Sequence, residues 1–343
     1  MKKNCTALVK RIGRIIGLSA LGFMFVASSV GTVSAKNKKF GVFVGINDYP
    51  GMNNDLSGAV NDARNLRKLL TIRFRFLPSN TTLLLDKSAT RANIIAKIKE
   101  YGQLAGNGDI LVFHYSGHGS LFLDSESDEL DERTKVEVDA DIGNGQRYVL
   151  PLDFYDSALV PWDSGLDTSG KPWGNLILDD ELYGLFSPIT KKGVTVVFIS
   201  DSCHSGSISK AQTKGSKIRF MAPEQALNIK SLSDIKRRNI EGQIKVESRN
   251  LNGSYLALAA AKDNEFAMDS SGGASPGGLF TATLIQIIKS SRAPLTYKRL
   301  MEMVRSKVSE VSSNAFSNDQ HPQLEIRFGS AESKIFEPII RMK

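Results

Sequence analysis

Runs of consecutive apolar residues alternate along the chain with stretches in which apolar residues recur every three or four positions. Consecutive apolar runs are typical of strands buried on both faces, and the three-to-four spacing is typical of helices packed on a sheet. This alternation predicts an α/β fold with a mainly parallel sheet and crossover helices. The strand-like runs lie at 40–46, 81–85, 109–115, 194–200, 254–260 and 323–328.

The positions of two strands in the sheet can be predicted from their composition. Residues 194–200 are rich in β-branched side chains, which fits a central parallel strand. Residues 323–328 close the series and are expected at an edge.

Four helices are predicted from the periodic stretches. Ser57, Thr90 and Thr296 precede such stretches and are the residue types that cap helix N-termini. The last two helices are expected at 278–289 and 296–311. The first two carry the apolar stripes Val60, Ala63, Leu66, Leu69 and Leu70, and Ile94, Ile95, Ile98 and Tyr101.

Two insertions interrupt the alternation. Residues 124–147 contain an acidic cluster followed by a polar, glycine-containing loop. Residues 205–252 are poor in aromatic side chains and rich in lysine and arginine, which predicts a basic, mobile linker at the surface. We expect both to be insertions in a single domain that spans residues 36–343.

The first 35 residues have the character of a targeting segment. Basic residues come first, residues 15–33 are apolar or small and carry no charge, and Val33-Ser34-Ala35 has the small-x-small pattern of a signal-peptidase site. The segment therefore predicts a signal peptide at 1–35 and export to the periplasm or the extracellular space. The alternative is an uncleaved membrane anchor formed by residues 15–33.

The net charge changes when this segment is removed. The whole chain has 44 basic and 36 acidic residues, a net charge of +8. Residues 1–35 hold five of the basic residues and no acidic ones, so the remainder has 39 against 36, a net charge of +3. This near balance and the lack of any recognisable nucleic-acid-binding motif argue against a nucleic-acid partner.

Cysteine usage narrows the chemistry further. Cys5 lies in the predicted signal, so the mature chain retains Cys203 as its single cysteine. An intramolecular disulfide is then excluded, and Cys203 is either a packed core residue or a reactive thiol.

Two strand ends carry residues suited to covalent catalysis. The strand at 109–115 leads into His-Tyr-Ser-Gly-His-Gly at 114–119, and the strand at 194–200 leads into Asp-Ser-Cys-His-Ser-Gly at 201–206. Ligands of parallel sheets bind at the carboxyl ends of strands. If these ends are adjacent, His118 can take the proton of the Cys203 thiol. The backbone N–H groups of Gly119 and Cys203 would then face the developing oxyanion.

These paired motifs resemble those of the metacaspases, within the wider caspase-like clan. The resemblance spans about residues 40–327 and implies a caspase-like fold, with a mainly parallel central sheet flanked by helices on both faces. Further segments agree with it: Gly-Ile-Asn at 45–47, Leu-Ser-Gly at 56–58, Asn-Asp-Ala at 61–63, Leu-Asp-Asp-Glu at 178–181 and Gly-Gly-Leu-Phe-Thr at 277–281.

The resemblance also implies roles for individual residues. His118 is the expected general base and Cys203 the expected nucleophile of a cysteine endopeptidase that forms an acyl-enzyme. Asp62, Ser116 and Asp201 match the positions that line the pocket for the residue before the cut bond, the S1 pocket. Carboxylates there suit arginine or lysine, so the expected partners are proteins or peptides with basic residues.

Calcium and self-cleavage are further expectations from the resemblance. Some metacaspases bind Ca²⁺ through loop carboxylates, and a hard cation requires several oxygen ligands. The basic linker would also offer the enzyme cleavage sites within its own chain, at Lys210, Lys214, Lys217, Arg219, Lys230, Arg237, Arg238, Lys245 and Arg249. The candidate calcium ligands are Glu126, Asp128, Asp131, Asp179 and Asp180.

Simpler interpretations stay open for some of these residues. His114 and His118 could bind zinc together with Cys203, although we favour a core position for His114. Asp179 could be a helix N-cap as well as a metal ligand. The chain could also be a catalytically silent caspase-like binding module, but silent members usually lack the histidine or the cysteine.

Overall fold

The computed structural model describes most of the chain after the predicted signal peptide, and these residues belong to one compact unit, Asn37–Lys343. Residues 1–36 lie outside the described part. Within it, no helix combines the length and the apolar character needed to cross a membrane. The described residues are 37–51, 54–123, 137–141, 147–151, 155–165, 174–203, 216–221, 226, 254–262, 265–270, 276–316, 319–327 and 329–337.

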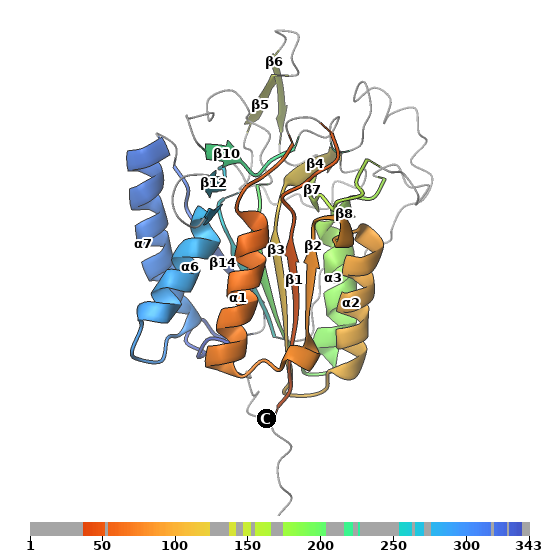
Figure 1. Ribbon diagram of the computed structural model, residues 1–343, viewed down its shortest axis with the longest axis vertical. Coiled ribbons are helices and arrows are strands. Elements are labelled where there is room, and N and C mark those ends of the chain that lie inside the picture. Colours follow the sequence, from red (N-terminus) through yellow and green to blue (C-terminus); the bar gives the residue numbers. More distant parts are fainter. Residues whose placement is uncertain are drawn as a thin grey trace, which may run out of the picture. The chain divides into compact units, whose positions relative to one another are not determined.

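A six-stranded sheet forms the centre of the fold (Figure 1). Its strand order is β14-β11-β9-β3-β1-β2, and every neighbouring pair is parallel except β11 with β14. The strands are β1 Lys39–Gly45, β2 Thr81–Leu85, β3 Ile110–Ser116, β9 Thr195–Asp201, β11 Tyr255–Ala259 and β14 Gln323–Arg327.

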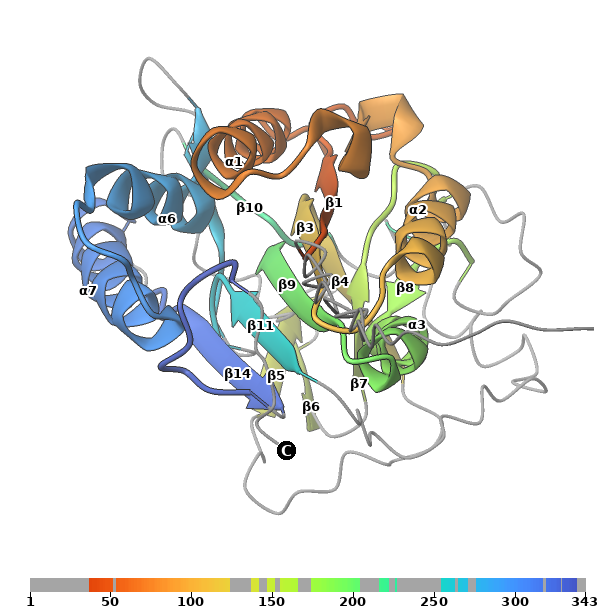
Figure 2. The ribbon, with the colours of Figure 1, turned by 90° about the horizontal axis from the view of Figure 1, so that it is seen from below.

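Helices cover both faces of the sheet (Figure 2). On one face, α1 (Ala59–Phe74), α6 (Leu279–Ser290) and α7 (Tyr297–Phe316) pack over an apolar cluster. On the other, α2 (Arg91–Leu104) and α3 (Asp179–Lys191) pack over a second cluster.

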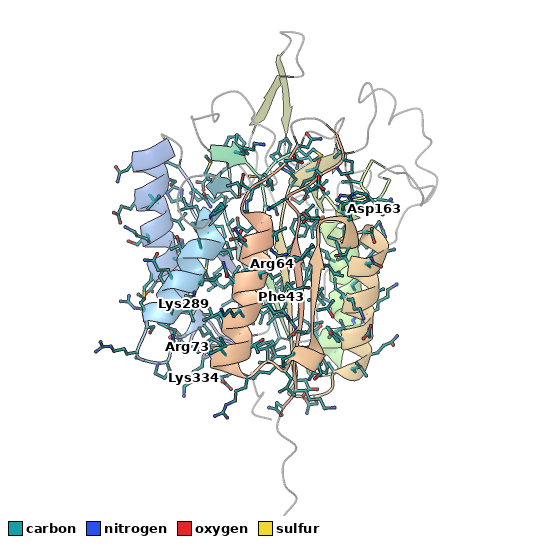
Figure 3. All side chains as sticks on the ribbon, in the orientation of Figure 1. Phe43, Arg64, Arg73, Asp163, Lys289 and Lys334 are labelled. Atoms are coloured by element: carbon teal, nitrogen blue, oxygen red, sulfur yellow. The ribbon has the colours of Figure 1, made fainter. Side chains whose placement is uncertain are left out.

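Single side chains show how the first face is joined. Phe43 of β1 lies buried in the cluster beneath α1 (Figure 3). Arg73, in the last turn of α1, donates hydrogen bonds to the carbonyl oxygens of Ile288 and Ser291 at the end of α6.

Short strands lie beyond the carboxyl ends of the central strands (Figure 1). They form two three-stranded sheets, β4-β7-β8 and β10-β12-β13, and the pair β5-β6. Two 3-10 turns, η1 Pro78–Asn80 and η2 Asp86–Ser88, flank β2. The short strands are β4 Gly119–Leu123, β5 Glu137–Asp141, β6 Arg147–Pro151, β7 Tyr155–Leu159, β8 Ile177–Leu178, β10 Ser216–Ile218, β12 Met268–Ser270 and β13 Gly277–Gly278.

The central strands agree with the sequence prediction to within two residues at each end. Strand β9 is central and β14 is an antiparallel edge, as predicted. The caps at Thr90 and Thr296 are confirmed, since each hydroxyl accepts the N–H three residues later. The cap at Ser57 is wrong: Gly58 precedes α1 without a side-chain cap. The backbone N–H of Ser57 instead donates to Asp269, at 2.7 Å.

Part of the basic stretch 205–252 differs from the predicted surface linker. Residues 216–218 form β10, which pairs antiparallel with β12. Arg219, the next residue, has no exposed side-chain surface. This segment therefore packs into the carboxyl end of the fold.

Candidate active site

The two catalytic candidates leave neighbouring strands. β3 and β9 pair in parallel with Ser116 opposite Asp201. His118 and Cys203 each lie two residues further along, and the N–H of Gly117 still reaches the carbonyl oxygen of Asp201 at 3.4 Å. Both side chains are buried. The register of the sheet thus brings the two motifs to one place.

The ring of His118 is oriented by backbone and aromatic contacts. Its Nε2 lies 2.7 Å from the carbonyl oxygen of Asn54, which can only accept, so Nε2 carries the proton. Nδ1 is buried, and no described group hydrogen-bonds to it. The Tyr49 hydroxyl accepts the N–H of His118 at 2.9 Å, and its ring lies 4.8 Å from the imidazole. This tautomer leaves Nδ1 as the basic nitrogen.

Both members of the pair are neutral at pH 7 in this state. Burial lowers the pKa of His118 to about 4. Burial raises the pKa of the Cys203 thiol to about 12, although the sulfur accepts the N–H of Ala267 at 2.8 Å. The thiol therefore has to lose its proton during attack rather than beforehand.

A buried arginine occupies the space beside this pair. Arg219 Nη2 donates to Asp62 Oδ2 and to Asp269 Oδ1, each at 2.8 Å. Nη1 donates to Ser116 Oγ at 2.5 Å and to the carbonyl oxygen of Asp201 at 3.0 Å. Asp201 Oδ1 also lies 3.2 Å from Nη1. Three carboxylates and one hydroxyl thus surround a single guanidinium.

Backbone N–H groups hold these carboxylates in place. Asp201 uses Oδ2 to accept the N–H of Thr281 at 2.9 Å, and Asp269 uses Oδ2 to accept that of Ser57 at 2.7 Å. Each therefore presents its other oxygen to the guanidinium. Asp62 Oδ2 accepts the N–H of Gly278 at 2.9 Å. The pocket is arranged by the fold, so a cation entering it meets acceptors already in position.

Burial and charge act in opposite directions on these carboxylates. Burial raises the pKa of Asp62 to about 7, and the positive charge of Arg219 offsets part of that rise. At Asp269 burial also opposes ionisation, but Arg219 and the N–H groups of Ser57 and Gly58 outweigh it and lower the pKa. The pocket depends on a bound cation to keep its charge.

The main chain of Arg219 lies across the catalytic pair. Its carbonyl oxygen accepts the N–H groups of Gly119 at 2.9 Å and of Cys203 at 3.1 Å. Its own N–H donates to the carbonyl oxygen of Ala267 at 3.1 Å. Two N–H groups on one carbonyl oxygen are the arrangement that stabilises the oxyanion of acyl transfer.

Comparison with known proteins agrees with this arrangement. The family model described as the caspase domain matches residues 38–329, which is most of the chain. The chain belongs to the caspase domain family.

Curated relatives of this caspase domain include metacaspases. Metacaspase-4 of Arabidopsis thaliana is 35% identical over 175 residues, which cover 50% of this chain and 34% of that protein. Metacaspase-1 of Cryptococcus neoformans is 33% identical over 175 residues, covering 49% of this chain and 32% of that protein. The matched segment thus spans about a third of the length of these relatives.

A solved structure shares the fold. The crystal structure of protein GSU0716 from Geobacter sulfurreducens superposes with a TM-score of 0.60 at 22% sequence identity. The superposition covers 88% of this chain and 100% of that one. Together with the caspase-domain match and the mainly parallel sheet, this shows that the caspase-like α/β fold predicted from the sequence is correct.

The caspase domain brings the residues predicted for the S1 pocket and for the oxyanion together around Arg219. The residues predicted for the S1 pocket all contact its guanidinium, and the two predicted oxyanion donors both contact its carbonyl oxygen. These residues are Asp62, Ser116 and Asp201 for the guanidinium, and Gly119 and Cys203 for the carbonyl.

Sequence reasoning missed two contributors to this site and did not single out a third, Arg219, among the nine basic residues predicted as cleavage sites in the linker. Asp269 is a third carboxylate of the pocket, Asn54 supplies the carbonyl oxygen that orients His118, and Arg219 fills the pocket. Asp269 had one usable signal, because it follows the apolar residues 266–268 much as Asp201 follows its strand. Asn54 acts through its backbone, which no side-chain pattern can indicate.

Gly278 lines the pocket at a point where no side chain fits. A Cβ built on it would lie 2.7 Å from Cζ of Arg219 and 2.3 Å from Asp201 Oδ2. Its φ of −66° and ψ of 135° are accessible to any residue. Space for the guanidinium, rather than backbone conformation, therefore explains glycine here.

The described residues give little support to the metal-binding alternatives. His114 is fully buried in β3, its Nε2 lies 3.5 Å from Thr281 Oγ1, and burial lowers its pKa to about 3. No group of three or more His, Cys, Asp or Glu side chains in the described part is placed to hold a metal ion.

The calcium candidates are only partly described. Asp179 and Asp180 lie in the first turn of α3, where the N–H of Asp180 donates to Asp179 Oδ1 at 3.0 Å. Leu178 is the N-cap residue, so a cap at Asp179 is wrong by one position. Glu126, Asp128 and Asp131 lie outside the described residues.

Proposed function

We propose that this chain is a cysteine endopeptidase that cleaves the peptide bond after arginine or lysine. Cys203 is the nucleophile and His118 is the general base. Asp62, Ser116 and Asp201, together with Asp269, bind the basic side chain before the cut. The metacaspase relatives are consistent with this activity.

The observation that carries the proposal is the position of Arg219. Its guanidinium contacts three carboxylates, while its carbonyl oxygen accepts two N–H groups, one of them from Cys203 itself. A substrate arginine before the cut bond needs both contacts at once. The internal segment thus serves as a template for how a substrate would bind.

The proposed reaction steps follow from the neutral protonation states of Cys203 and His118. As Cys203 Sγ attacks the carbonyl carbon, its proton passes to Nδ1 of His118, and the oxyanion is stabilised by the N–H groups of Gly119 and Cys203. His118 then gives this proton to the leaving amine, so the C–N bond breaks and an acyl-enzyme forms. Water, deprotonated by His118, attacks the thioester and releases a carboxylate, and the thiol regains its proton.

A panel of fluorogenic peptides tests this function. Peptides that differ only in the residue before the cut are incubated with the wild-type chain and with Cys203→Ala. Cleavage after arginine and lysine, none after aspartate, and none with Cys203→Ala are expected. Efficient cleavage after aspartate, or indifference to this residue, would contradict the pocket assignment. Binding without turnover would favour a catalytically silent module.

Self-cleavage between Arg219 and Phe220 is a second part of the proposal. Arg219 is held both at its guanidinium and at its carbonyl oxygen, the two contacts that the proposed mechanism requires of a substrate, and it lies in the basic stretch that offers cleavage sites. While it stays bound, other substrates are excluded from the acidic pocket. The intact chain is therefore a latent form, and release of this segment gives access to the site.

Two neighbouring basic residues provide a matched test of self-cleavage. Arg219→Gln removes the charge from the buried side chain, whereas Lys217→Gln removes it from an exposed one whose Nζ donates a hydrogen bond to the carbonyl oxygen of Asp55. Gel analysis should show self-cleavage lost in the first variant and retained in the second. Equal loss in both would contradict a specific role for Arg219.

Export is a further proposal, supported by the basic and apolar pattern of residues 1–35. Cell fractionation and the N-terminus of the exported chain test it. A chain that begins at Lys36 is expected. Retention of the segment in membranes would favour the anchor formed by residues 15–33.

A further inference from the structure

The bound segment continues past the cut bond in an ordered way. The N–H of Met221 donates to the carbonyl oxygen of Gly119 at 2.9 Å, and Phe220 forms a parallel bridge with Gly119. The N–H of the same glycine binds the carbonyl oxygen of Arg219. Gly119 therefore holds the chain on both sides of the bond.

The two sides of the cut bond join different small sheets. Before the cut, β10 pairs antiparallel with β12. After it, residues 220–221 lie along β4, whose other edge pairs with β7, so that Gly119 also faces Leu159. A substrate would in this way add a strand to each sheet, which is a common mode of peptide recognition.

The side chains after the cut are buried to different degrees. Met221 is only 3% exposed and belongs to the apolar cluster that contains Leu159 and Val160. Phe220 is partly buried against the cluster on the opposite face. Lys217, before the cut, is exposed. Among these positions, the second residue after the cut is the one most enclosed by the protein.

We infer that the site has a second specificity pocket, which binds a large apolar side chain two residues after the cut. This inference rests on the proposed function and specifies its substrate class further, as polypeptides in which a basic residue is followed by two apolar ones. Substrates that end in a dye directly after the arginine lack this contact.

Quenched peptides based on residues 216–222 test the second pocket. The position of Met221 is varied as Met, Leu, Ser or Asp, and kcat/KM is measured with the full chain. Leu should stay within about threefold of Met, Ser should fall about tenfold, and Asp should fall further, because a buried apolar side chain is replaced by a polar or charged one. Ser in place of Lys217 is the control, and its effect should stay under about threefold because that side chain is exposed.

Two readouts separate this inference from the proposed function. Equal kcat/KM for all four peptides would overturn the second pocket and leave cleavage after arginine standing. The same peptides are also titrated into Cys203→Ala/Arg219→Ala/Met221→Ser, whose own segment lacks the two side chains that fill the pockets. If the affinity falls from Met and Leu to Ser and then to Asp while the wild-type chain cleaves none of the peptides, the peptidase proposal is overturned and the second pocket stands. Equal affinities would overturn the pocket.

Discussion

Buried carboxylates at the two ends of the central sheet are satisfied in different ways. At the amino end of β3, Asp109 accepts the backbone N–H groups of Lys38 at 2.7 Å and Gly106 at 2.9 Å. At the carboxyl end, Asp62, Asp201 and Asp269 share the guanidinium of Arg219. The carboxylate of Asp109 is satisfied by hydrogen bonds from nearby backbone N–H groups. The charges of Asp62, Asp201 and Asp269 are instead balanced by Arg219, which lies in a segment distant from them in sequence.

This difference separates a structural charge from a recognition site. A buried ion cluster gains little over apolar packing, because desolvating each charge offsets the attraction. The carboxyl end nevertheless concentrates such charges, while apolar clusters cover both faces of the sheet. This concentration of charge is explained if Arg219, the cation of the cluster, can be exchanged for the basic side chain of a substrate.

The largest effect on activity is expected from substitution of the catalytic pair, which lies at the same carboxyl end of the sheet as the three carboxylates around Arg219. Cys203→Ala and His118→Ala should each lower peptide cleavage by at least about a thousandfold, since the nucleophile or its base is lost. Circular dichroism should show an unchanged fold. Near wild-type turnover in either variant would contradict the mechanism.

The next largest effect is expected at the three shared carboxylates. Asp62→Asn and Asp269→Asn each remove the charge from a hydrogen bond with the guanidinium, and Asp201→Asn removes the charge of an ion pair with it. A charge-assisted hydrogen bond is worth about 1.5–3 kcal/mol. At tenfold per 1.36 kcal/mol, kcat/KM for arginine peptides should fall about ten- to a hundredfold. Asp109→Asn is the control: it should lower the melting temperature while kcat/KM is retained. Equal losses of activity at both ends would refute the comparison.

Space in the pocket can be tested separately from its charge. Gly278→Ala places a methyl group against both the Asp201 carboxylate and the guanidinium, so kcat/KM for arginine peptides should fall by about tenfold. Gly184→Ala, in α3, is the matched control, because nothing lies within 4 Å of its added Cβ. Unchanged kinetics of Gly278→Ala would show that this glycine does not limit the pocket.

Most of the fold could be predicted from the sequence, because its strands and helices arise from local apolar patterns. The catalytic motifs could also be predicted, since each follows directly from a strand. The roles of Asp269 and Arg219 could be predicted only in part, because their segments meet the rest of the pocket only in the folded chain. Asp62 and Arg219 are 157 positions apart. Arg219 also lies between Ile218 and Phe220, and this alternation of charged and apolar residues predicts an exposed arginine rather than a buried one.

A smaller effect is expected from pH. Burial raises the pKa of Asp62 to about 7, so its carboxyl is neutral below this pH and charged above it. Cleavage after arginine should therefore increase several-fold as the pH rises through about 7. In Asp62→Asn the rise of activity around pH 7 should be lost. Activity should instead fall only as the pH approaches 4, where His118 gains its proton. An unchanged profile in the variant would assign this rise to another group.

The smallest effect is expected from calcium. The described carboxylates among its candidate ligands are Asp179 and Asp180, which lie together at the start of α3. Millimolar Ca²⁺ should raise activity modestly over chelator, and Asp179→Asn/Asp180→Asn should weaken the response. Identical activity with chelator and with Ca²⁺ would remove this proposal.

The central claim is that Arg219 occupies the site as a substrate does. The most direct measurement is the N-terminal sequence of the fragments that form when the purified chain is incubated, beside the Cys203→Ala chain. A new N-terminus at Phe220 in the wild type, with the Cys203→Ala chain left intact, is the predicted result. Cuts at other basic residues with the Arg219–Phe220 bond intact, or the same cut in both chains, would contradict it.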